Sequence, residues 1–409
     1  MLLKLALPNY LALLSGVIAG VIDVAWIARL GSAPAAAVAV ATSVENVLLG
    51  LVLLIHGGLT VVIAGRSGAA AATAIRAGWI LYALLTPAVV AAGLLLREPL
   101  AALLLPDPHA ADLAVDFLTI LFPGLVVFYA QSVVDGIFAG HGDTRTPMRL
   151  ALTANGLLLV LDPILIYGAG LGVTGAALAT LIGRTIALLT GLTLLRRRGL
   201  RGAGPASVRE VAAAGTPIAG DFLLRMGGAL AVVAVVGRFG VTQIAAYGIG
   251  VKVLYLATMG FYALRNATTI LAARTGGERG LARRAVTAAL VAGTGSALLF
   301  AILADPLMRL FTTDPPVVAA GVSFLRAIGG YLVPIAVVIV LGGYLTGTGR
   351  GSRLMMITLA GMITQTALAW LLSHHFGLYG VWLAMAAAAL IQLVAVLPAA
   401  RSSREYAAY

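Results

Sequence analysis

The sequence predicts an all-α membrane protein with twelve transmembrane helices in two pseudo-symmetric six-helix lobes. Three observations carry this prediction: the composition, the number of long apolar segments and an internal repeat. Of the 409 residues, 61% are hydrophobic and only 10% are charged, whereas soluble domains carry about 25% charged residues. The mean hydropathy of +1.04 points the same way.

A transmembrane helix needs about 20 mainly apolar residues, and twelve segments of the chain meet this requirement. The expected spans cover residues 6–28, 36–63, 77–96, 114–139, 148–167, 174–195, 214–237, 244–272, 285–304, 318–345, 355–374 and 378–399. The 49 glycines suit such a bundle, because small residues let membrane helices approach each other closely.

Basic residues at the ends of the spans predict the orientation. With a cytoplasmic N-terminus, most of them fall on the cytoplasmic side, as the positive-inside rule requires. That side receives Lys4, Arg66, Arg76, Arg145, Arg149, the clusters in 196–209 and 274–284, Arg350, Arg353, Arg401 and Arg404, and the other side receives Arg29, Arg97, Arg238 and Arg309. We therefore expect a multi-pass protein of the cell inner (plasma) membrane with both termini cytoplasmic. The net charge of +12 then reflects topology, and no nucleic acid is expected as a partner.

Four pairs of motifs repeat in register along the chain. The distance from Pro8 to Gly31 equals that from Pro217 to Gly240. The other pairs are IAGRSG (63–68) with LAARTGG (271–277), GIFAGHGDTRTPM (136–148) with GYLTGTGRGSRLM (343–355), and GLGVTGAALAT (170–180) with HFGLYGVWLAM (375–385). The repeat predicts an N-terminal lobe over 1–200, a cytoplasmic linker over 201–215 and a C-terminal lobe over 216–409. Paired repeats of this kind are typical of transporters.

Asp23 lies in the middle of the first span, in GVIDVAWIARLG (20–31). A charged carboxylate at the centre of a bilayer costs roughly 2.5–3.5 kcal/mol on insertion scales, and such residues mark functional sites by default. A buried carboxyl group can alternate between a neutral form and an anion that holds a cation. We expect Asp23 to act in this way, and the alternative is a structural aspartate bonded to hydroxyls or amides. Its counterpart in the second half is Val232, so the scaffold itself does not require the acid.

The frame of Pro8, Asp23 and Gly31, the loop GHGDTRTPM (140–148) and the segment LDPILIYGAGLGVTGAALAT (161–180) resemble the multidrug and toxic compound extrusion (MATE) transporters. The resemblance covers nearly the whole chain, and the position of Asp23 resembles the prokaryotic branch related to the DNA-damage-inducible F transporters. It implies two lobes in a V shape around a central cavity and cation-coupled export by alternating access. We expect a monomer in the lipid bilayer with a small organic molecule as its substrate.

The resemblance also implies roles for single residues. It places the coupling aspartate of helix 1 at Asp23, the helix 5 aspartate at Asp162, the helix 6 threonine at Thr180 and the helix 1 bend at Pro8. Relatives often have asparagine four residues before the helix 5 aspartate, where this chain has Leu158, and Asn155 lies two turns before Asp162 and can face the same side. A sodium site needs several oxygen ligands, so these departures favour a proton over Na⁺ as the coupling ion.

Other embedded polar and aromatic residues are candidates for a substrate cavity. Glu45 can contact cationic substrates or pair with an arginine such as Arg184, Arg265 or Arg326. Asp221 and Arg225 lie four residues apart on one helix face and predict an intrahelical ion pair, with a C-lobe coupling or substrate acid as the alternative. Tyr129 and Trp26 can attract organic cations, and their alternative is packing or anchoring at the membrane interface.

Two local features concern the backbone. Pro163 follows Asp162 and removes a backbone donor, which predicts a disturbed helix at this point, and the alternative role of Asp162 is to stabilise that kink. In the GDTRTP loop, we expect Asp143 to cap or pair locally, with closure of a gate as a further possibility. No metal site is expected, because the chain has no cysteine and its five histidines lack neighbours at ligand spacing.

These features predict a secondary antiporter that exports amphipathic, cationic organic compounds, with proton coupling favoured over sodium coupling. No cofactor is expected. The alternatives are a sodium-coupled exporter and a flippase for lipid-linked precursors, which would use a cationic cavity with Arg225, Arg265 and Lys252. A membrane-embedded enzyme is not expected, because the chain has neither a nucleophile with its base nor an HExxH zinc motif.

Overall fold

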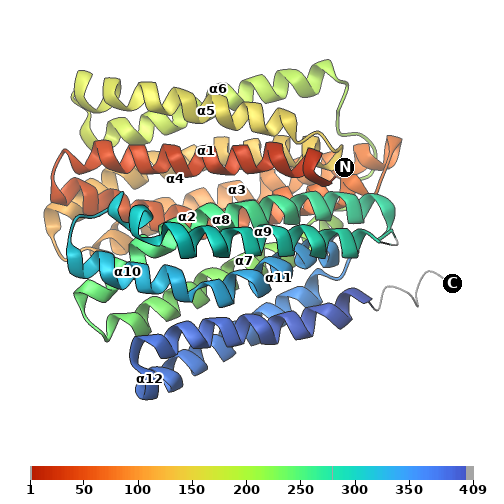
Figure 1. The fold of residues 1–409 in the computed structure, drawn as a ribbon. Coiled ribbons are helices and arrows are strands. Elements are labelled where there is room, and N and C mark those ends of the chain that lie inside the picture. The colour runs from red at the N-terminus through yellow and green to blue at the C-terminus, as the bar shows by residue number, and fades with distance from the viewer. Residues whose placement is uncertain (1, 279, 402–409) are drawn as a thin grey trace. The chain divides into compact units, whose positions relative to one another are not determined.

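The computed structural model describes residues 2–278 and 280–401, so Arg279 and Arg404, which we counted among the cytoplasmic charges, lie outside the described residues. Nearly all of the described chain is helical (Figure 1). The elements are α1 (Leu2–Ala28), α2 (Ser32–Ala64), α3 (Gly68–Leu104), α4 (Pro108–Gly140), α5 (Arg145–Pro163), the π-helical turn η1 (Ile164–Gly168), α6 (Gly172–Arg197), α7 (Val208–Gly237), α8 (Val241–Thr275), α9 (Leu281–Arg309), α10 (Pro315–Ala327), α11 (Gly329–Gly347) and α12 (Gly351–Arg401).

The prediction of an all-α membrane protein is confirmed. Among the described residues, 11 helices are long and apolar enough to cross a membrane. Three expected spans differ in detail. The span expected at 318–345 is divided into α10 and α11 at Ile328, and the last two expected spans share α12. Gly377 separates them, because its φ of 58° and ψ of −142° interrupt the helix inside α12.

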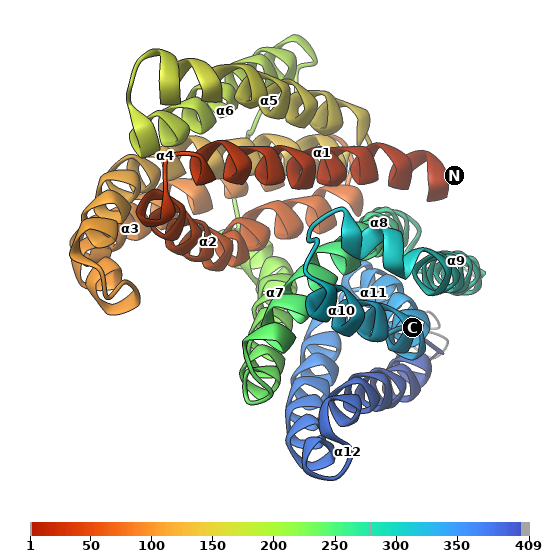
Figure 2. The same ribbon diagram turned by 60° about the vertical axis from the view of Figure 1, so that its left-hand side comes forward.

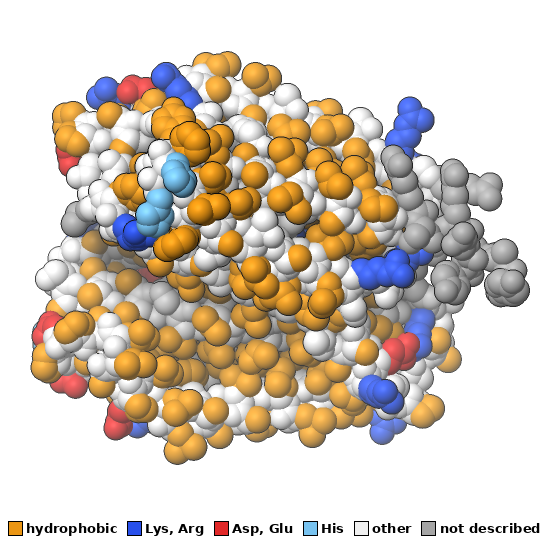
Figure 3. Space-filling model, turned by 90° about the horizontal axis from the view of Figure 1, so that it is seen from below, with side chains coloured by type: hydrophobic (Ala, Val, Ile, Leu, Met, Phe, Trp, Pro, Cys, Tyr) orange, Lys and Arg blue, Asp and Glu red, His pale blue; other side chains and the backbone are white. Residues whose placement is uncertain are grey.

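The surface of the helices agrees with a membrane setting. On the face shown in Figure 3, hydrophobic side chains fill the middle of the helices, and charged side chains gather near the helix ends. Many large apolar side chains on this and other faces are exposed, among them Leu95, Leu310 and Ile302. Contiguous apolar surface of this extent is rare on soluble monomers, whereas hydrocarbon is a suitable solvent for it.

The chain divides into two compact units, and the first comprises Leu11–Ala219. In this unit α4 is the central helix and packs against α2, α3 and α6. Its buried side includes Phe122, Tyr129 and Phe138, which belong to one hydrophobic core. Helices α5 and α6 pack side by side (Figure 2). We call this part of the chain the N-terminal unit.

The second unit comprises Met1–Tyr10 and Gly220–Tyr409, and we call it the C-terminal unit. Here α11 takes the central position and packs against α8, α9 and α12. Residues 334–346 of α11 are all buried. A mainly apolar helix therefore lies at the centre of each unit, α4 in the first and α11 in the second.

Pro163 shapes the end of α5. The α-helix ends at this residue, and the π-helical turn η1 follows over Ile164–Gly168. Proline lacks the backbone N–H that would continue the hydrogen-bond ladder, so the chain changes its helical repeat at this point. The predicted disturbance after Asp162 is therefore confirmed, and single π-helical turns of this kind are frequent at functional sites.

Candidate functional site

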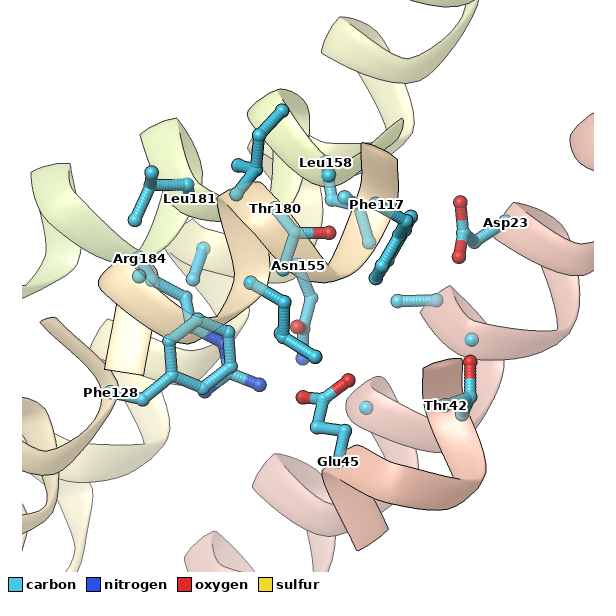
Figure 4. A pocket seen from close by; sticks show the side chains of 18 of the residues that line it. Asp23, Thr42, Glu45, Phe117, Phe128, Asn155, Leu158, Thr180, Leu181 and Arg184 are labelled. Carbon is cyan, nitrogen blue, oxygen red and sulfur yellow. The ribbon is translucent and has the colours of Figure 1, made fainter. Parts of the chain in front are cut away.

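A cavity of about 230 Å³ lies inside the N-terminal unit between α1, α2, α4, α5 and α6. Its polar lining residues come from four of these helices and are Asp23, Thr42, Glu45, Asn46, Asn155, Thr180 and Arg184 (Figure 4). Four of the candidate residues, Asp23, Glu45, Asn155 and Thr180, therefore surround one space although they are up to 157 residues apart in sequence. This cavity is the candidate functional site.

Small side chains bring α1 close to α5 and α6 at the level of the cavity. Ala19, Leu158 and Ala179 form a separate small core among these three helices. One turn away, the Asn155 side-chain amide donates a hydrogen bond of 2.8 Å to the Ser15 hydroxyl and joins α5 to α1. Leu158 thus contributes packing at the position where relatives often have asparagine, and Asn155 supplies the polar group two turns before Asp162.

Asp23 and Asp162 are two carboxyl groups without local compensation. Asp23 faces the cavity, and its buried Oδ1 atom has no hydrogen-bond partner among the described residues. Asp162 on α5 is fully buried and is not among the residues that line the cavity, and neither of its oxygens has such a partner. The two groups are close enough to interact electrostatically. Interacting carboxyl groups take up and release protons as a pair, so this pair can hold a proton or another cation.

Glu45 and Arg184 point into the same cavity from α2 and α6 (Figure 4). Their charges attract each other, although these two described side chains form no direct ion pair. The Arg184 guanidinium stacks 4.2 Å from the centroid of the Phe128 ring, which is a favourable cation–π distance. Of the three arginines that we considered as partners for Glu45, Arg184 is the one that lines the cavity with it. The cavity thus carries its own cation.

Tyr129 and Trp26 do not line this cavity. Tyr129 is fully buried in the core around α4, with its hydroxyl 3.5 Å from the Leu48 carbonyl oxygen. Trp26 packs edge-on against Tyr167 at a ring distance of 5.9 Å, and the Tyr167 hydroxyl donates to the Trp26 carbonyl oxygen. Successive residues of an α-helix point about 100° apart, and Phe128 rather than Tyr129 has the position on α4 that faces the cavity. Both side chains have packing contacts here, and a role of either in a substrate cavity stays a prediction.

Pro8 is buried within α1, and the helix continues through it from Leu2 to Ala28. It belongs to the C-terminal unit, whereas Asp23 belongs to the N-terminal unit. The structure therefore separates the proline and the acid of the first helix into different parts of the fold. The bend that we expect at Pro8 stays a prediction.

The C-terminal unit has a second buried acid, Asp221. Arg225 approaches it at 3.2 Å, so the predicted intrahelical ion pair is present. Arg265 on α8 donates to the same carboxylate at 2.5 Å, and the Thr358 hydroxyl on α12 donates at 2.5 Å. Arg225 also donates to the Thr358 hydroxyl at 3.3 Å. Asp221 is fully buried, and it lies at the centre of a hydrogen-bond network with Arg225, Arg265 and Thr358.

In the GDTRTP loop, Asp143 caps the start of α5, as we expected. Its Oδ1 accepts the backbone N–H groups of Arg145 and Thr146, each at 3.0 Å. Its Oδ2 accepts the Thr146 hydroxyl at 2.5 Å and Arg198 at 2.6 Å. Partial burial opposes ionisation, but the hydrogen bonds from Thr146 and Arg198 prevail and hold the pKa of the Asp143 carboxyl below its usual range. The loop is thereby tied to the end of α6.

Several residues of the site were not predicted from the sequence. Thr42 and Asn46 line the cavity beside Glu45, and the spacing of three residues between Thr42 and Glu45 is a signal that could have found the first of them. The roles of Arg265 and Thr358 depend on contacts across 44 and 137 residues of sequence, for which a single sequence offers no local signal. Among the described residues, no group of three or more His, Cys, Asp or Glu side chains could hold a metal ion.

Comparisons with known proteins show which family, relatives and solved structures the chain is similar to. The model of the MatE family matches residues 8–164 and 217–371, and the two matched stretches begin at the prolines that the internal repeat aligned. The chain is 27% identical to the probable multidrug resistance protein NorM of Thermotoga maritima, over 94% of this chain and 88% of the relative. It is 25% identical to an FAD transporter of Shewanella oneidensis, over 94% of this chain and 90% of the relative. Among solved structures, a MOP superfamily transporter from Pyrococcus furiosus matches with a TM-score of 0.91 at 21% identity, covering 98% of this chain and 94% of that one.

Proposed function

The chain belongs to the MatE family of membrane transporters, and we propose that it is a secondary antiporter that exports amphipathic, cationic organic compounds in exchange for protons. The observation that carries this proposal is the polar cavity inside the otherwise apolar N-terminal unit, with Asp23 at its wall and the fully buried Asp162 on α5, a helix that also lines the cavity. The multidrug resistance names of its relatives support export of organic molecules. We further propose alternating access, a monomer, and a plasma-membrane location with both termini in the cytoplasm.

Protonation of the carboxyl pair provides the coupling. In the protonated state the two groups are neutral and suit their apolar surroundings. After release of a proton to the cytoplasm, the negative charge favours a cationic compound or a change in the packing of α1. Uptake of a proton from the other side removes that charge and releases the compound. A transporter that alternates between these states exchanges one cation for another.

The surroundings of Asp162 favour a proton over sodium as the coupling ion. A sodium site needs several oxygen ligands around a bare ion, whereas neither oxygen of Asp162 has a polar partner among the described residues and Leu158 lies four residues before it. A proton forms a covalent bond to a carboxylate oxygen, so it needs no such cage. Sodium coupling is the less favoured form of the same proposal.

A flippase for lipid-linked precursors is the second candidate function. It is favoured by the basic network of Arg225 and Arg265 around Asp221, because such precursors carry phosphate groups. The relative named as an FAD transporter also carries an anionic compound. In that case transport would depend on the arginines of the C-terminal unit more than on Asp23.

Transport in proteoliposomes tests the proposal. Purified protein is reconstituted, and efflux of the fluorescent cation ethidium is measured under a proton gradient and, separately, under a sodium gradient. We expect the proton gradient to drive efflux, and we expect Asp23→Asn and Asp162→Asn each to reduce it roughly tenfold or more, the equivalent of about 1.4 kcal/mol. Asp305→Asn is the control, since Asp305 forms a partly exposed pair with Arg309 far from the cavity in sequence.

Undiminished proton-driven efflux in both cavity variants would overturn the coupling role of the pair. Efflux driven by sodium alone would replace the proton with sodium. Loss of efflux in Asp305→Asn as well would show that the assay reports general damage rather than coupling.

A further inference from the structure

The network around Asp221 carries more positive than negative charge. One carboxylate faces two guanidinium groups, those of Arg225 and Arg265, and arginine stays protonated in proteins. The other acids described in this unit do not compensate the excess, because Glu278 pairs with Arg284, Asp305 pairs with Arg309 and Asp314 is exposed. The network thus retains one uncompensated positive charge within the described residues.

Arg265 carries an unsatisfied donor of this network. Its Nη1 atom donates to Asp221, whereas its buried Nη2 atom has no hydrogen-bond partner among the described residues. The Arg265 side chain is only 6% exposed, so water does not freely replace the missing partner. A buried charge without full compensation costs several kcal/mol, which makes an orphan guanidinium donor an unusual feature of a stable core.

Two tyrosines, Tyr262 and Tyr331, lie near the arginines. The Tyr262 ring lies 5.9 Å from the Arg265 guanidinium carbon, and Tyr262 and Tyr331 lie close enough to Arg225 to interact electrostatically. Both tyrosines are half-buried, and Arg225 is more exposed than Arg265, at 15% of its side chain. Arg225 is therefore the less buried end of the network, and the side chains near it come from α7, α8 and α11.

We propose that Arg225 and Arg265 form a binding site for an oxyanion, such as the phosphate or carboxylate group of a small organic compound or of a lipid headgroup. Guanidinium groups bind such oxyanions through charge-assisted, often bidentate hydrogen bonds. The anion would approach Arg225, the more exposed of the two arginines, and balance the excess charge of the network. This site goes beyond the proton coupling proposed for the N-terminal unit, and it extends the transported compounds to those that carry an anionic group.

Equilibrium binding tests the site independently of transport. The full-length protein in detergent is titrated with riboflavin 5′-phosphate, with neutral riboflavin as the matched probe, and fluorescence polarisation reports binding. In a second arm, thermal stability is compared in nanodiscs of phosphatidylcholine and in nanodiscs that also contain phosphatidylglycerol. We expect an anion-dependent signal in one or both arms: preferential binding of the phosphorylated probe assigns the site to a soluble compound, and stabilisation by phosphatidylglycerol assigns it to a lipid.

Variants locate the binding. Arg265→Met leaves Asp221 and Arg225 as a balanced pair, so we expect a folded protein that has lost the anion-dependent signal by roughly tenfold or more, as for a lost charged hydrogen bond. Arg265→Lys retains the charge without the second N–H group and should weaken binding less, and it replaces Arg265→Met if that variant does not fold. Arg309→Gln removes an exposed arginine of the same unit and should leave the signal unchanged.

Two results overturn the proposal. One is the absence of any anion-dependent signal in the wild-type protein in both arms. The other is an equal signal in wild type and in the Arg265 variants, which would place the anion elsewhere. Because neither measurement uses an ion gradient, failure of the anion site is distinguishable from failure of the proposed antiport.

Discussion

Replacement of Asp221 by asparagine should destabilise the C-terminal unit strongly. Asparagine keeps the shape and one acceptor oxygen but removes the only negative charge that, within the described part of the chain, faces Arg225 and Arg265. The carboxylate is fully buried, and its contacts to Arg265 and Thr358 are both 2.5 Å long. Loss of one partner from a buried ion pair costs about 3–5 kcal/mol, because the other charge stays buried. Here two guanidinium groups lose their partner, so we expect a loss at the upper end of this range.

The chain contains a closely matched control. Asp305 and Arg309 are also an aspartate and an arginine four residues apart on one helix, at 2.7 Å, but their side chains are 48% and 63% exposed. Exposed pairs contribute little to stability, so Asp305→Asn should have a much smaller effect than Asp221→Asn. Chemical denaturation in mixed micelles gives the free energy of unfolding, and size-exclusion chromatography after heating gives an independent ranking.

A rescue variant separates charge from shape. Asp221→Asn combined with Arg265→Met leaves one buried guanidinium group, as in the uncompensated wild-type network, and should recover part of the lost stability. The reasoning is wrong if Asp221→Asn is as stable as Asp305→Asn, or if the double variant is less stable than Asp221→Asn alone.

Two further predictions concern the N-terminal unit. The pKa of Asp143 lies below its usual range, so its bond to Arg198 stabilises the fold at pH values above the ordinary carboxyl pKa, and this stabilisation disappears as the pH falls through the lowered pKa. Asp143→Asn should therefore lower the melting temperature at neutral pH and make the melting temperature decrease less as the pH becomes acidic. A melting temperature with the same pH profile in the variant as in the wild type would refute this role. A Cβ atom on Gly215 would lie 1.9 Å from the Leu54 carbonyl oxygen, so Gly215→Ala should cost about 1–3 kcal/mol of stability through overpacking. Gly156→Ala is the control, because a Cβ at Gly156 has no neighbour within 4 Å and alanine favours a helix. Equal stability of the two variants would contradict the close approach of α7 to α2.

Properties that depend on local sequence could be predicted well. The length and apolarity of the spans, the disturbed helix at Pro163 and the i,i+4 pair of Asp221 and Arg225 all follow from residues close together in the chain. The division between α10 and α11 was missed, because a continuous apolar run gives no sign of a break at Ile328.

The part of the candidate site that depends on contacts between distant helices could not be predicted from the sequence. Asp23, Asn155 and Thr180 were candidates from the sequence, and the structure shows that they line one cavity. The choice of Arg184 over other arginines as the neighbour of Glu45 required the packing of α2 and α6. Tyr129 illustrates the converse, since a shift of one residue on α4 separates a side chain in the core from one at the cavity wall.

The turn at Gly377 has a mechanical consequence for the last two spans. A single residue with φ of 58° connects them, whereas ten residues separate the end of α6 from the start of α7. An extended chain gains at most about 3.6 Å of reach per residue, so one residue leaves no slack between its flanking helices. A Cβ on Gly380 would lie 2.2 Å from the Leu372 carbonyl oxygen, which shows that the two arms of this hairpin are also in backbone contact. The two spans of residues 351–401 are therefore joined closely at this end, and a displacement of one span at the turn carries the adjoining end of the other with it.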